Sequence, residues 1–216
     1  VYASATMTEE FVNEKQAENN DIKVIRIDSQ ESVSHIQHYF VTVNNRYKVD
    51  ELKRLAQMDN MRAIVFFEQI NQIEGVAAKL IYENVSVVVL HSDASNQERE
   101  YAIRAFKNHD VTYLLTTDVA SRGMDISEVP YVIHYNRVQD SRTYIHRSGR
   151  TGRMNREGIV ISLLNQQEAN DLAAILKEEN IPLTEKVLKN RILIEPTQAR
   201  GTKNQEKQGQ NRRKRT

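Results

Sequence analysis

The stretch that decides the fold opens with Thr116-Thr117-Asp118-Val119-Ala120-Ser121-Arg122-Gly123-Met124-Asp125-Ile126 and closes with Tyr144-Ile145-His146-Arg147-Ser148-Gly149-Arg150-Thr151-Gly152-Arg153. The second block carries three arginines at three-residue spacing with two glycines between them, which is poor material for a regular helix face. Glycine removes side-chain bulk so that the backbone can approach a ligand, and a guanidinium offers a planar fork of donors suited to phosphate oxygens. A solvated basic loop is the alternative, but with the first block alongside, the pattern favours a polyphosphate partner.

Outward from this stretch, strand-like and helix-like segments alternate, which indicates βαβ units and a mostly parallel, twisted sheet covered on both faces. The periodicity predicts strands over Gln37–Val43, Arg62–Phe67, Val85–Leu90, Val111–Thr116, Tyr131–Tyr135 and Gly158–Leu164. It predicts helices over Arg46–Gln57, Ile70–Leu80, Ser95–Phe106, Asp140–Ile145 and Gln166–Lys177. Ligands of such sheets gather at the carboxyl ends of the strands, where His91, Thr117 and Asn136 fall.

Both ends of the chain are less regular. Near the beginning, Thr6 and Glu9 have the spacing of a capping box, and Ile22–Ile27 alternates like a strand before the polar linker Asp28–Ser34. After Pro182 the pattern is weak, with one possible short strand over Arg191–Ile194. Past Pro196 the chain is rich in Gln, Asn, Lys, Arg and Gly, and we expect it to be disordered.

Composition describes an ordinary globular protein. The 216 residues are 39% hydrophobic and 27% charged, which suffices for one good-sized domain with a substantial core. There is no cysteine, so disulfides and thiolate metal sites are excluded, and a reducing cytoplasm fits. No apolar run approaches the roughly 20 residues that span a bilayer, and no signal-peptide pattern is present, so we expect no membrane partner.

The net charge of +1 conceals an asymmetry. Residues 200–216 contain seven bases and one acid, a net charge of +6, so the remainder carries −5. A near-neutral body with a basic tail predicts an auxiliary electrostatic contact with nucleic acid.

Four segments resemble the ordered sequence motifs of DEAD-box RNA helicases: Ser4-Ala5-Thr6, Asn96-Gln97-Glu98-Arg99, Thr117–Ile126 and His146–Arg153. The similarity runs from the first residues to about Arg200, and the last two motifs are the specific ones. The resemblance implies a RecA-like three-layer α/β/α sandwich with a mostly parallel sheet. It also implies four parts: the C-terminal end of a first RecA-like domain (1–28), a linker (29–35), a C-terminal RecA-like domain (36–199) and a disordered basic tail (200–216).

The resemblance assigns the nucleotide site. Arg150 and Arg153 match arginine fingers for the γ-phosphate of ATP, a role that suits phosphoryl transfer because it needs charge stabilisation more than covalent help. His146 matches the residue that links this motif to the first domain's acidic motif and to its Ser-Ala-Thr, so Ser4 and Thr6 are expected in interdomain coupling. Gly123 and Asp125 match positions near the ribose; a turn with an N-capping Asp is the alternative for Asp125.

The resemblance also assigns sequence-independent contacts to the RNA backbone. The expected residues are Arg99, Asn96, Thr117, Asp118 and Arg122. Being anionic, Asp118 is expected to orient Arg122 or a loop amide rather than touch phosphate, and Arg147 is expected to be structural or interfacial. The sequence departs from the family at Asn96, where Gln is usual, and at Asn136-Arg137-Val138, where Asp-x-Pro is common.

Two expected motifs are absent from the sequence. None of the seven glycines begins a Gly-x-x-x-x-Gly-Lys-Ser/Thr loop, and no Asp-Glu-Ala-Asp occurs, so Mg²⁺ and the phosphates of ATP are expected to be held by the N-terminal RecA-like domain of a longer parent. The parent is expected to be a cytoplasmic ATP-dependent RNA helicase and this chain alone to be inactive. No residue pattern specifies a ribosomal or RNA-decay partner. A non-catalytic RNA-binding or adaptor module and a DNA helicase of a related group are the alternatives.

Overall fold

The computed structural model describes residues 14–15, 17–18, 35–121, 126, 129–152 and 156–199. The chain forms two compact units, residues 1–31 and 32–216. In the first, the described residues are helical, and Lys15 Nζ lies 2.8 Å from Glu18 Oε2. The strand expected at Ile22–Ile27, the linker and the tail from Arg200 lie outside the described residues.

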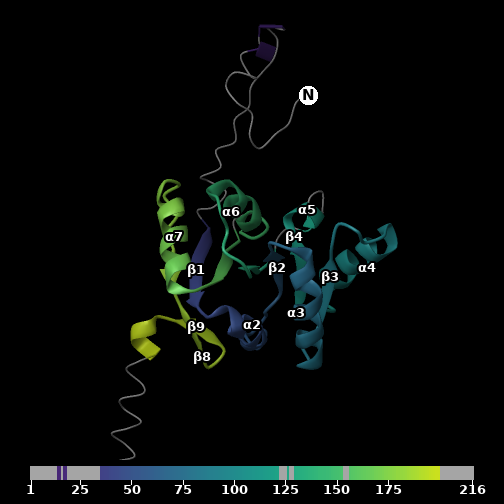
Figure 1. Ribbon diagram of the computed structural model, residues 1–216, viewed down its shortest axis with the longest axis horizontal. Coiled ribbons are helices and arrows are strands. Elements are labelled where there is room, and N and C mark those ends of the chain that lie inside the picture. The colour runs from purple at the N-terminus through teal and green to yellow at the C-terminus, as the bar shows by residue number, and fades with distance from the viewer. Residues whose placement is uncertain are drawn as a thin grey trace, which may run out of the picture. The chain divides into compact units, whose positions relative to one another are not determined.

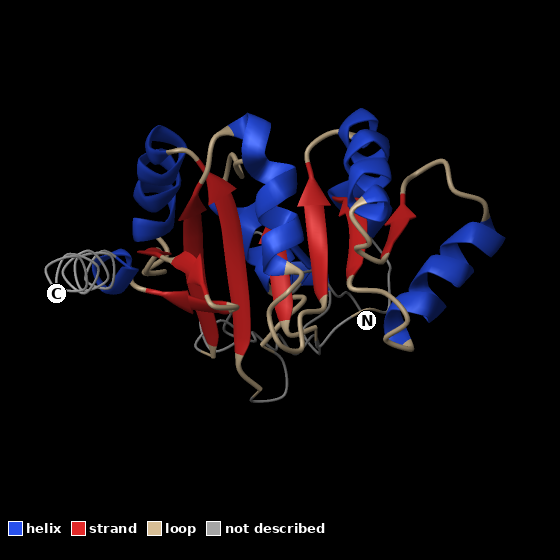
Figure 2. Cartoon of the chain, turned by 90° about the horizontal axis from the view of Figure 1, so that it is seen from below, coloured by secondary structure: helices blue, strands red, loops and turns tan. Residues whose placement is uncertain are grey.

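The second unit is built on a seven-stranded sheet in the order β3-β4-β2-β5-β6-β1-β7, and every pairing in it is parallel. Figure 2 shows the long strands side by side with their arrowheads at one edge. The strands are β1 (Ile36–Thr42), β2 (Ala63–Phe67), β3 (Val87–Leu90), β4 (Tyr113–Thr117), β5 (Tyr131–His134), β6 (Gly158–Leu164) and β7 (Thr184–Glu185). The α/β class and the parallel sheet predicted from the sequence are confirmed.

Helices cover both faces of this sheet (Figure 1). They are η1 (Asn45–Tyr47), α2 (Lys48–Leu55), α3 (Ile70–Tyr82), α4 (Asn96–Lys107), α5 (Asp118–Ser121), α6 (Ser141–Ser148) and α7 (Gln166–Lys177). Side chains of α2 and α3 pack in one core cluster, and those of α4, α6 and α7 pack in the other. Because successive strand residues point to opposite faces, β2 supplies Ile64 and Phe66 to the second cluster and Val65 and Phe67 to the first.

Local signals set most of the helix ends. The predicted capping boxes are present: Ser95 with Glu98 begins α4, and Asn165 with Glu168 begins α7. Asp140 caps α6 through a hydrogen bond from the Thr143 amide, 2.8 Å long. None of the described helices is long and apolar enough to cross a membrane.

Three details differ from the sequence-based expectation. The segment expected as one helix over Arg46–Gln57 divides into η1 and the shorter α2. An antiparallel hairpin of β8 (Val187–Lys189) and β9 (Ile192–Ile194) stands where one short strand was expected. Its two turn residues, Asn190 and Arg191, have positive φ, as a tight two-residue turn requires. Residues 196–199 are helical rather than disordered, and proline suits the first turn of a helix because its missing N–H is not needed there.

Candidate nucleic-acid interface and arginine loop

The N-terminus of α4 follows the carboxyl end of β3 and carries two of the residues predicted to contact RNA. The Ser95 hydroxyl accepts from the Glu98 amide, and the Glu98 carboxylate accepts from the Ser95 amide at 2.8 Å. This box leaves Asn96 exposed as the first helical residue. Arg99 is half-buried, and its Nη1 donates to the Ala120 carbonyl at 2.8 Å. Arg99 therefore ties α4 to the next strand-end segment.

That segment is the short helix α5, directly after β4. The Thr117 hydroxyl accepts from the Ala120 amide at 3.4 Å and so serves as its cap. The Asp118 carboxylate accepts two hydrogen bonds from Arg147: from Nε at 2.8 Å and from Nη2 at 2.5 Å. This bidentate pair joins residues 29 positions apart and is the strongest kind of side-chain contact in the region.

Among the described residues, Arg147 is the partner of Asp118, whereas the sequence proposed Arg122 or a loop amide, and the contact with Arg122 stays a prediction. Arg122 lies outside the described residues. Arg147 is 6% exposed, and its guanidinium carbon lies 5.1 Å from the centre of the Phe66 ring. A buried cation needs a carboxylate, and Asp118 supplies it. Spacing along the chain gave no signal for this pair, because α5 and α6 meet only through the sheet topology.

The arginine loop, residues 149–152, follows α6. Its backbone is fixed to the segment before β5: the Val129 amide donates to the Arg150 carbonyl at 3.3 Å, and the buried Thr151 hydroxyl donates to the Val129 carbonyl. His146 is exposed on α6, and the Arg150 side chain is half-buried. The loop thus lies at the amino ends of the strands. The carboxyl ends of the strands are occupied, as predicted, by His91, Thr117 and Asn136. The arginine loop is at the opposite edge of the sheet.

Close packing explains one glycine of this loop and one beside it. Gly152 has φ +67°, and a Cβ there would collide with the Ile36 side chain at the start of β1. A Cβ on Gly158, the first residue of β6, would lie 2.6 Å from the Gly152 nitrogen. Gly149, in contrast, would place a Cβ at an ordinary 3.4 Å from the Ile145 carbonyl. The loop is therefore held rigidly against β1 and β6.

Several predicted site residues lie outside the described residues: Ser4, Thr6, Arg122, Gly123, Asp125 and Arg153. Their roles stay predictions. The structure brings together Thr117, Asp118 and, through Ala120, Arg99.

The departure from the family pattern at Asn136-Arg137-Val138 leaves an ordered turn. Asn136 Oδ1 accepts from the Glu68 amide at 3.1 Å, and Arg137 donates to Asp171 at 2.7 Å. Val138 is buried in the core cluster beneath α6 and α7. Side-chain contacts therefore hold this turn, which in the family pattern contains a proline with a restricted φ.

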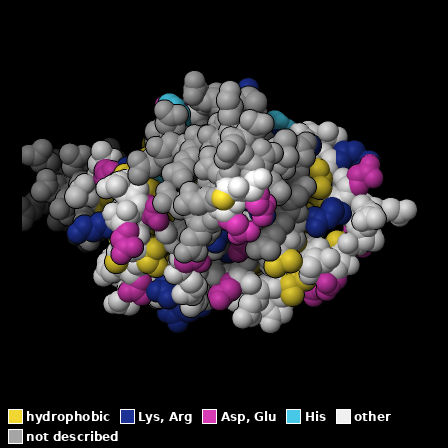
Figure 3. All heavy atoms as spheres, turned by 90° about the horizontal axis from the view of Figure 1, so that it is seen from above, with side chains coloured by type: hydrophobic (Ala, Val, Ile, Leu, Met, Phe, Trp, Pro, Cys, Tyr) yellow, Lys and Arg dark blue, Asp and Glu magenta, His cyan; other side chains and the backbone are white. Residues whose placement is uncertain are grey.

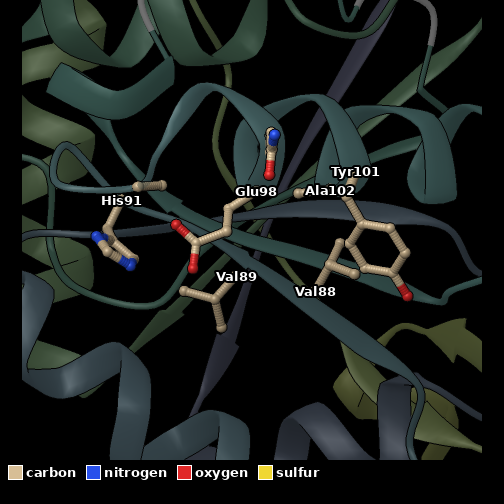
Figure 4. Close-up of a pocket in the computed structure, with 8 residues that line it drawn as sticks. Val88, Val89, His91, Glu98, Tyr101 and Ala102 are labelled. Atoms are coloured by element: carbon tan, nitrogen blue, oxygen red, sulfur yellow. The ribbon is translucent and has the colours of Figure 1, made fainter.

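An open pocket of about 470 Å³ lies beside the α4 N-terminus (Figure 4). Val88 and Val89 of β3 line it together with Ala102, while His91 and Glu98 lie at one end and Tyr101 at the other. Tyr101 is 60% exposed, and His91 Nδ1 has no hydrogen-bond partner among the described residues. No pattern in the sequence indicated that Tyr101 and His91 line a common pocket.

The described surface is electrostatically mixed. On the face that Figure 3 shows, the coloured basic, acidic and hydrophobic side chains are interspersed. Within the described ranges, no three His, Cys, Asp or Glu side chains gather in a group that could hold a metal ion.

The strand order, the two helical layers and the absence of a Gly-x-x-x-x-Gly-Lys-Ser/Thr loop from the sequence define a RecA-like α/β domain without its own phosphate-binding loop. Comparison with known proteins gives the family. Residues 47–155 match the family described as "Helicase conserved C-terminal domain". The chain therefore belongs to the helicase C-terminal domain family and, within it, to the DEAD-box group.

Individual relatives agree. The chain is 35% identical over 184 residues to the DEAD-box ATP-dependent RNA helicase CshC of Bacillus cereus and 38% identical over 187 residues to the probable ATP-dependent RNA helicase YfmL of Bacillus subtilis. Each match covers 85% of this chain but 47% and 49% of the relative, so the chain spans about half the length of these curated relatives.

Solved structures agree as well. The structure of the C-terminal domain of the DEAD-box protein Dbp5 is 34% identical with a TM-score of 0.62, and the match covers 71% of this chain and 91% of that one. S. cerevisiae Dbp5 bound to RNA and ADP BeF3 is 30% identical with a TM-score of 0.71, over 84% of this chain and 49% of that one.

Proposed function

We propose that this chain is the C-terminal half of an ATP-dependent RNA helicase, in which it completes an interdomain ATP site and binds the RNA backbone. Arg150 and Arg153 act as arginine fingers on the γ-phosphate, and Gly123 and Asp125 approach the ribose. Arg99, Asn96, Thr117, Asp118 and Arg122 form the RNA-facing set. The parent supplies an N-terminal RecA-like domain that holds Mg²⁺ and the phosphates of ATP.

The observation that carries this proposal is the bidentate ion pair between Asp118 and Arg147. Asp118 belongs to the RNA-facing segment, and Arg147 lies three residues before Arg150. This partly buried, bidentate link makes one mechanical unit of the segment proposed to touch RNA and the loop proposed to touch ATP. Such a link suits an enzyme in which the two ligands act on a single conformational change.

The domain assignment of the proposal is that residues 1–28 end the first RecA-like domain, 29–35 form the linker and 36–199 form the second domain, with a basic tail over 200–216. Closure of the two domains around ATP and RNA brings both arginines to the γ-phosphate and bends one RNA strand, which separates it locally from its partner. His146, Ser4 and Thr6 couple the two domains. Hydrolysis then releases the closed state.

The test is RNA-stimulated ATP hydrolysis by this chain, by the full-length parent, and by the parent with Arg150→Ala or Arg153→Ala. We expect an inactive chain, an active parent, and a loss of about 10³-fold or more in turnover for each variant, as is typical of arginine fingers. Arg137→Ala, which removes an arginine bound to Asp171 of α7, is the matched control and should retain turnover.

The alternative is a non-catalytic RNA-binding or adaptor module. A parent without any ATPase activity would favour it. A DNA helicase of a related group is the other alternative. Unwinding of RNA duplexes and of DNA duplexes by the full-length parent decides between an RNA helicase and a DNA helicase.

A further inference from the structure

Beneath α6, a line of polar side chains crosses the buried face of three strands. His134 of β5 is fully buried, and its Nδ1 lies 3.1 Å from Ser162 Oγ of β6. The Ser162 side chain lies within hydrogen-bonding reach of the hydroxyl of Tyr144, the fully buried tyrosine of α6, and lowers the pKa of that hydroxyl against the larger effect of burial. The same hydroxyl lies 3.0 Å from Nδ1 of His38 on β1, which is 5% exposed. These four residues, the histidine relay, join one helix to three strands.

The relay can run in either of two directions, and its buried surroundings select one of them. Tyr144 has a single hydroxyl proton and two partners, so it donates to one and accepts from the other. His134 Nε2 and Arg147 Nη1 are both buried and have no hydrogen-bond partner among the described residues. Arg147 lies near enough to lower the pKa of His134, so a lone pair on Nε2 is favoured over an N–H that would face this cation. The proton of neutral His134 is then on Nδ1.

The remaining bonds follow from that choice. His134 Nδ1–H donates to Ser162 Oγ, the Ser162 hydroxyl donates to Tyr144 Oη, and the Tyr144 hydroxyl donates to His38 Nδ1. His38 then carries its proton on Nε2. Every bond of the relay has one donor and one acceptor, and both rings are neutral.

We propose that His38 and His134 are positioning residues for the arginine loop, and that the relay through Ser162 and Tyr144 fixes the register of α6 on the sheet. Tyr144 lies one helical turn before Arg147 and Ser148, after which the loop begins, so a shift of Tyr144 moves Arg147, Asp118 and Arg150 together. The part of this inference that concerns catalysis rests on the proposed function; the part that concerns the relay does not.

The first arm of the test reads the relay directly. Nitrogen-15 spectra of the histidine rings in this 216-residue chain at pH 7 should show His134 as the Nδ1–H tautomer and His38 as the Nε2–H tautomer. Tyr144→Phe removes only the hydroxyl and should shift the ring signals of both His38 and His134. The opposite tautomers would overturn the assigned direction of the relay, and ring signals that Tyr144→Phe leaves unchanged would overturn the relay itself, whatever the parent catalyses.

The second arm measures ATP turnover by the full-length parent. Asn places an amide where Nδ1 of the ring was, so His134→Asn should keep the bond to Ser162 and stay within about threefold of the wild-type kcat, which corresponds to less than about 1 kcal/mol. His134→Leu and Tyr144→Phe should lower kcat by about tenfold or more with little change in the KM for RNA. Ile73→Val, a core substitution in α3, which packs in the other core cluster, controls for lost stability and should keep kcat.

Equal turnover in His134→Leu, Tyr144→Phe and wild type would refute the positioning role while leaving the proposed function standing. A parent that hydrolyses no ATP would instead refute the proposed function, and the spectra of the first arm would still decide whether the relay exists.

Discussion

At the scale of single residues, the region is governed by a buried arginine and its carboxylate. The side chain of Arg147 is 6% exposed, and that of Asp118 is 40% exposed. Removing the carboxylate leaves a buried guanidinium without its counter-charge, whereas the same change at an exposed pair removes little. The chain offers a matched, more exposed pair, because Asp171 is also 40% exposed but its partner Arg137 is 29% exposed instead of 6%.

Asp118→Asn should therefore lower the free energy of unfolding by about 2 kcal/mol, because Asp118 is partly solvated and the full penalty of a buried pair is larger. Asp171→Asn should cost less than about 1 kcal/mol. Urea unfolding of both variants, with wild type alongside, measures the difference. Equal losses would mean that burial of Arg147 does not set the strength of its pair.

Glycine gives a second pair of opposite cases. Gly152→Ala should destabilise the chain by about 2 kcal/mol or more, because φ +67° disfavours an L side chain and the new Cβ collides with Ile36. Gly75→Ala should instead add about 0.5 to 1 kcal/mol, because Gly75 is an exposed residue inside α3, and nothing lies within 4 Å of the place that its Cβ would take. Thermal unfolding of the two variants should shift in opposite directions, and a Gly152→Ala variant as stable as wild type would contradict the tight packing of the loop on β1.

At the scale of elements, α4 and α7 begin with the same capping box but belong to different parts of the domain. Ser95→Ala and Asn165→Ala should each cost about 1 kcal/mol of stability, because each leaves an N-terminal amide without its acceptor. Only Ser95→Ala should weaken the affinity for single-stranded RNA, by about two- to fivefold, because only α4 presents its first turn beside Asn96 and Arg99. Fluorescence anisotropy with a labelled oligonucleotide measures this, and equal RNA affinities for the two variants would remove the α4 N-terminus from the interface.

Element by element, what could be predicted depended on how local the signal was. Strand β2 and the caps of α4 and α7 are encoded within a few residues, and the sequence predicted them. Of the hairpin, β9 was predicted and β8 was not, because Asn190-Arg191 is a weaker turn signal than Asn followed by Gly. The Asp118–Arg147 pair could not be predicted from spacing, since it depends on which helices meet across the sheet.

At the scale of the whole molecule, the two relay histidines make stability depend on pH. Burial lowers the pKa of His38 from 6.5 to about 4. Burial, the charge of Arg147 and the nearby His38 lower the pKa of His134 well below 6.5. The other groups that face the relay are Tyr144, whose pKa burial raises, and Asp118 through its bond to Arg147. Both histidines therefore fold as neutral rings at pH 7.

The sign follows from proton uptake. Below pH 6.5 the unfolded chain protonates these histidines and the folded chain does not, so stability is complete above 6.5 and falls as the pH approaches 4. The lowered carboxylate pKa values of Glu98 and Asp140 act mainly near and below their ordinary values of 4.5 and 3.8, so the histidines carry most of the loss between about pH 7.5 and about pH 4.5. His38 alone should cost about 2.5 kcal/mol across this window, with His134 adding in the same direction.

Urea unfolding at both pH values should show this loss in wild type and a much smaller one in the double variant His38→Asn/His134→Asn. Equal losses in the two proteins would show that the relay histidines are not the groups that bind the protons.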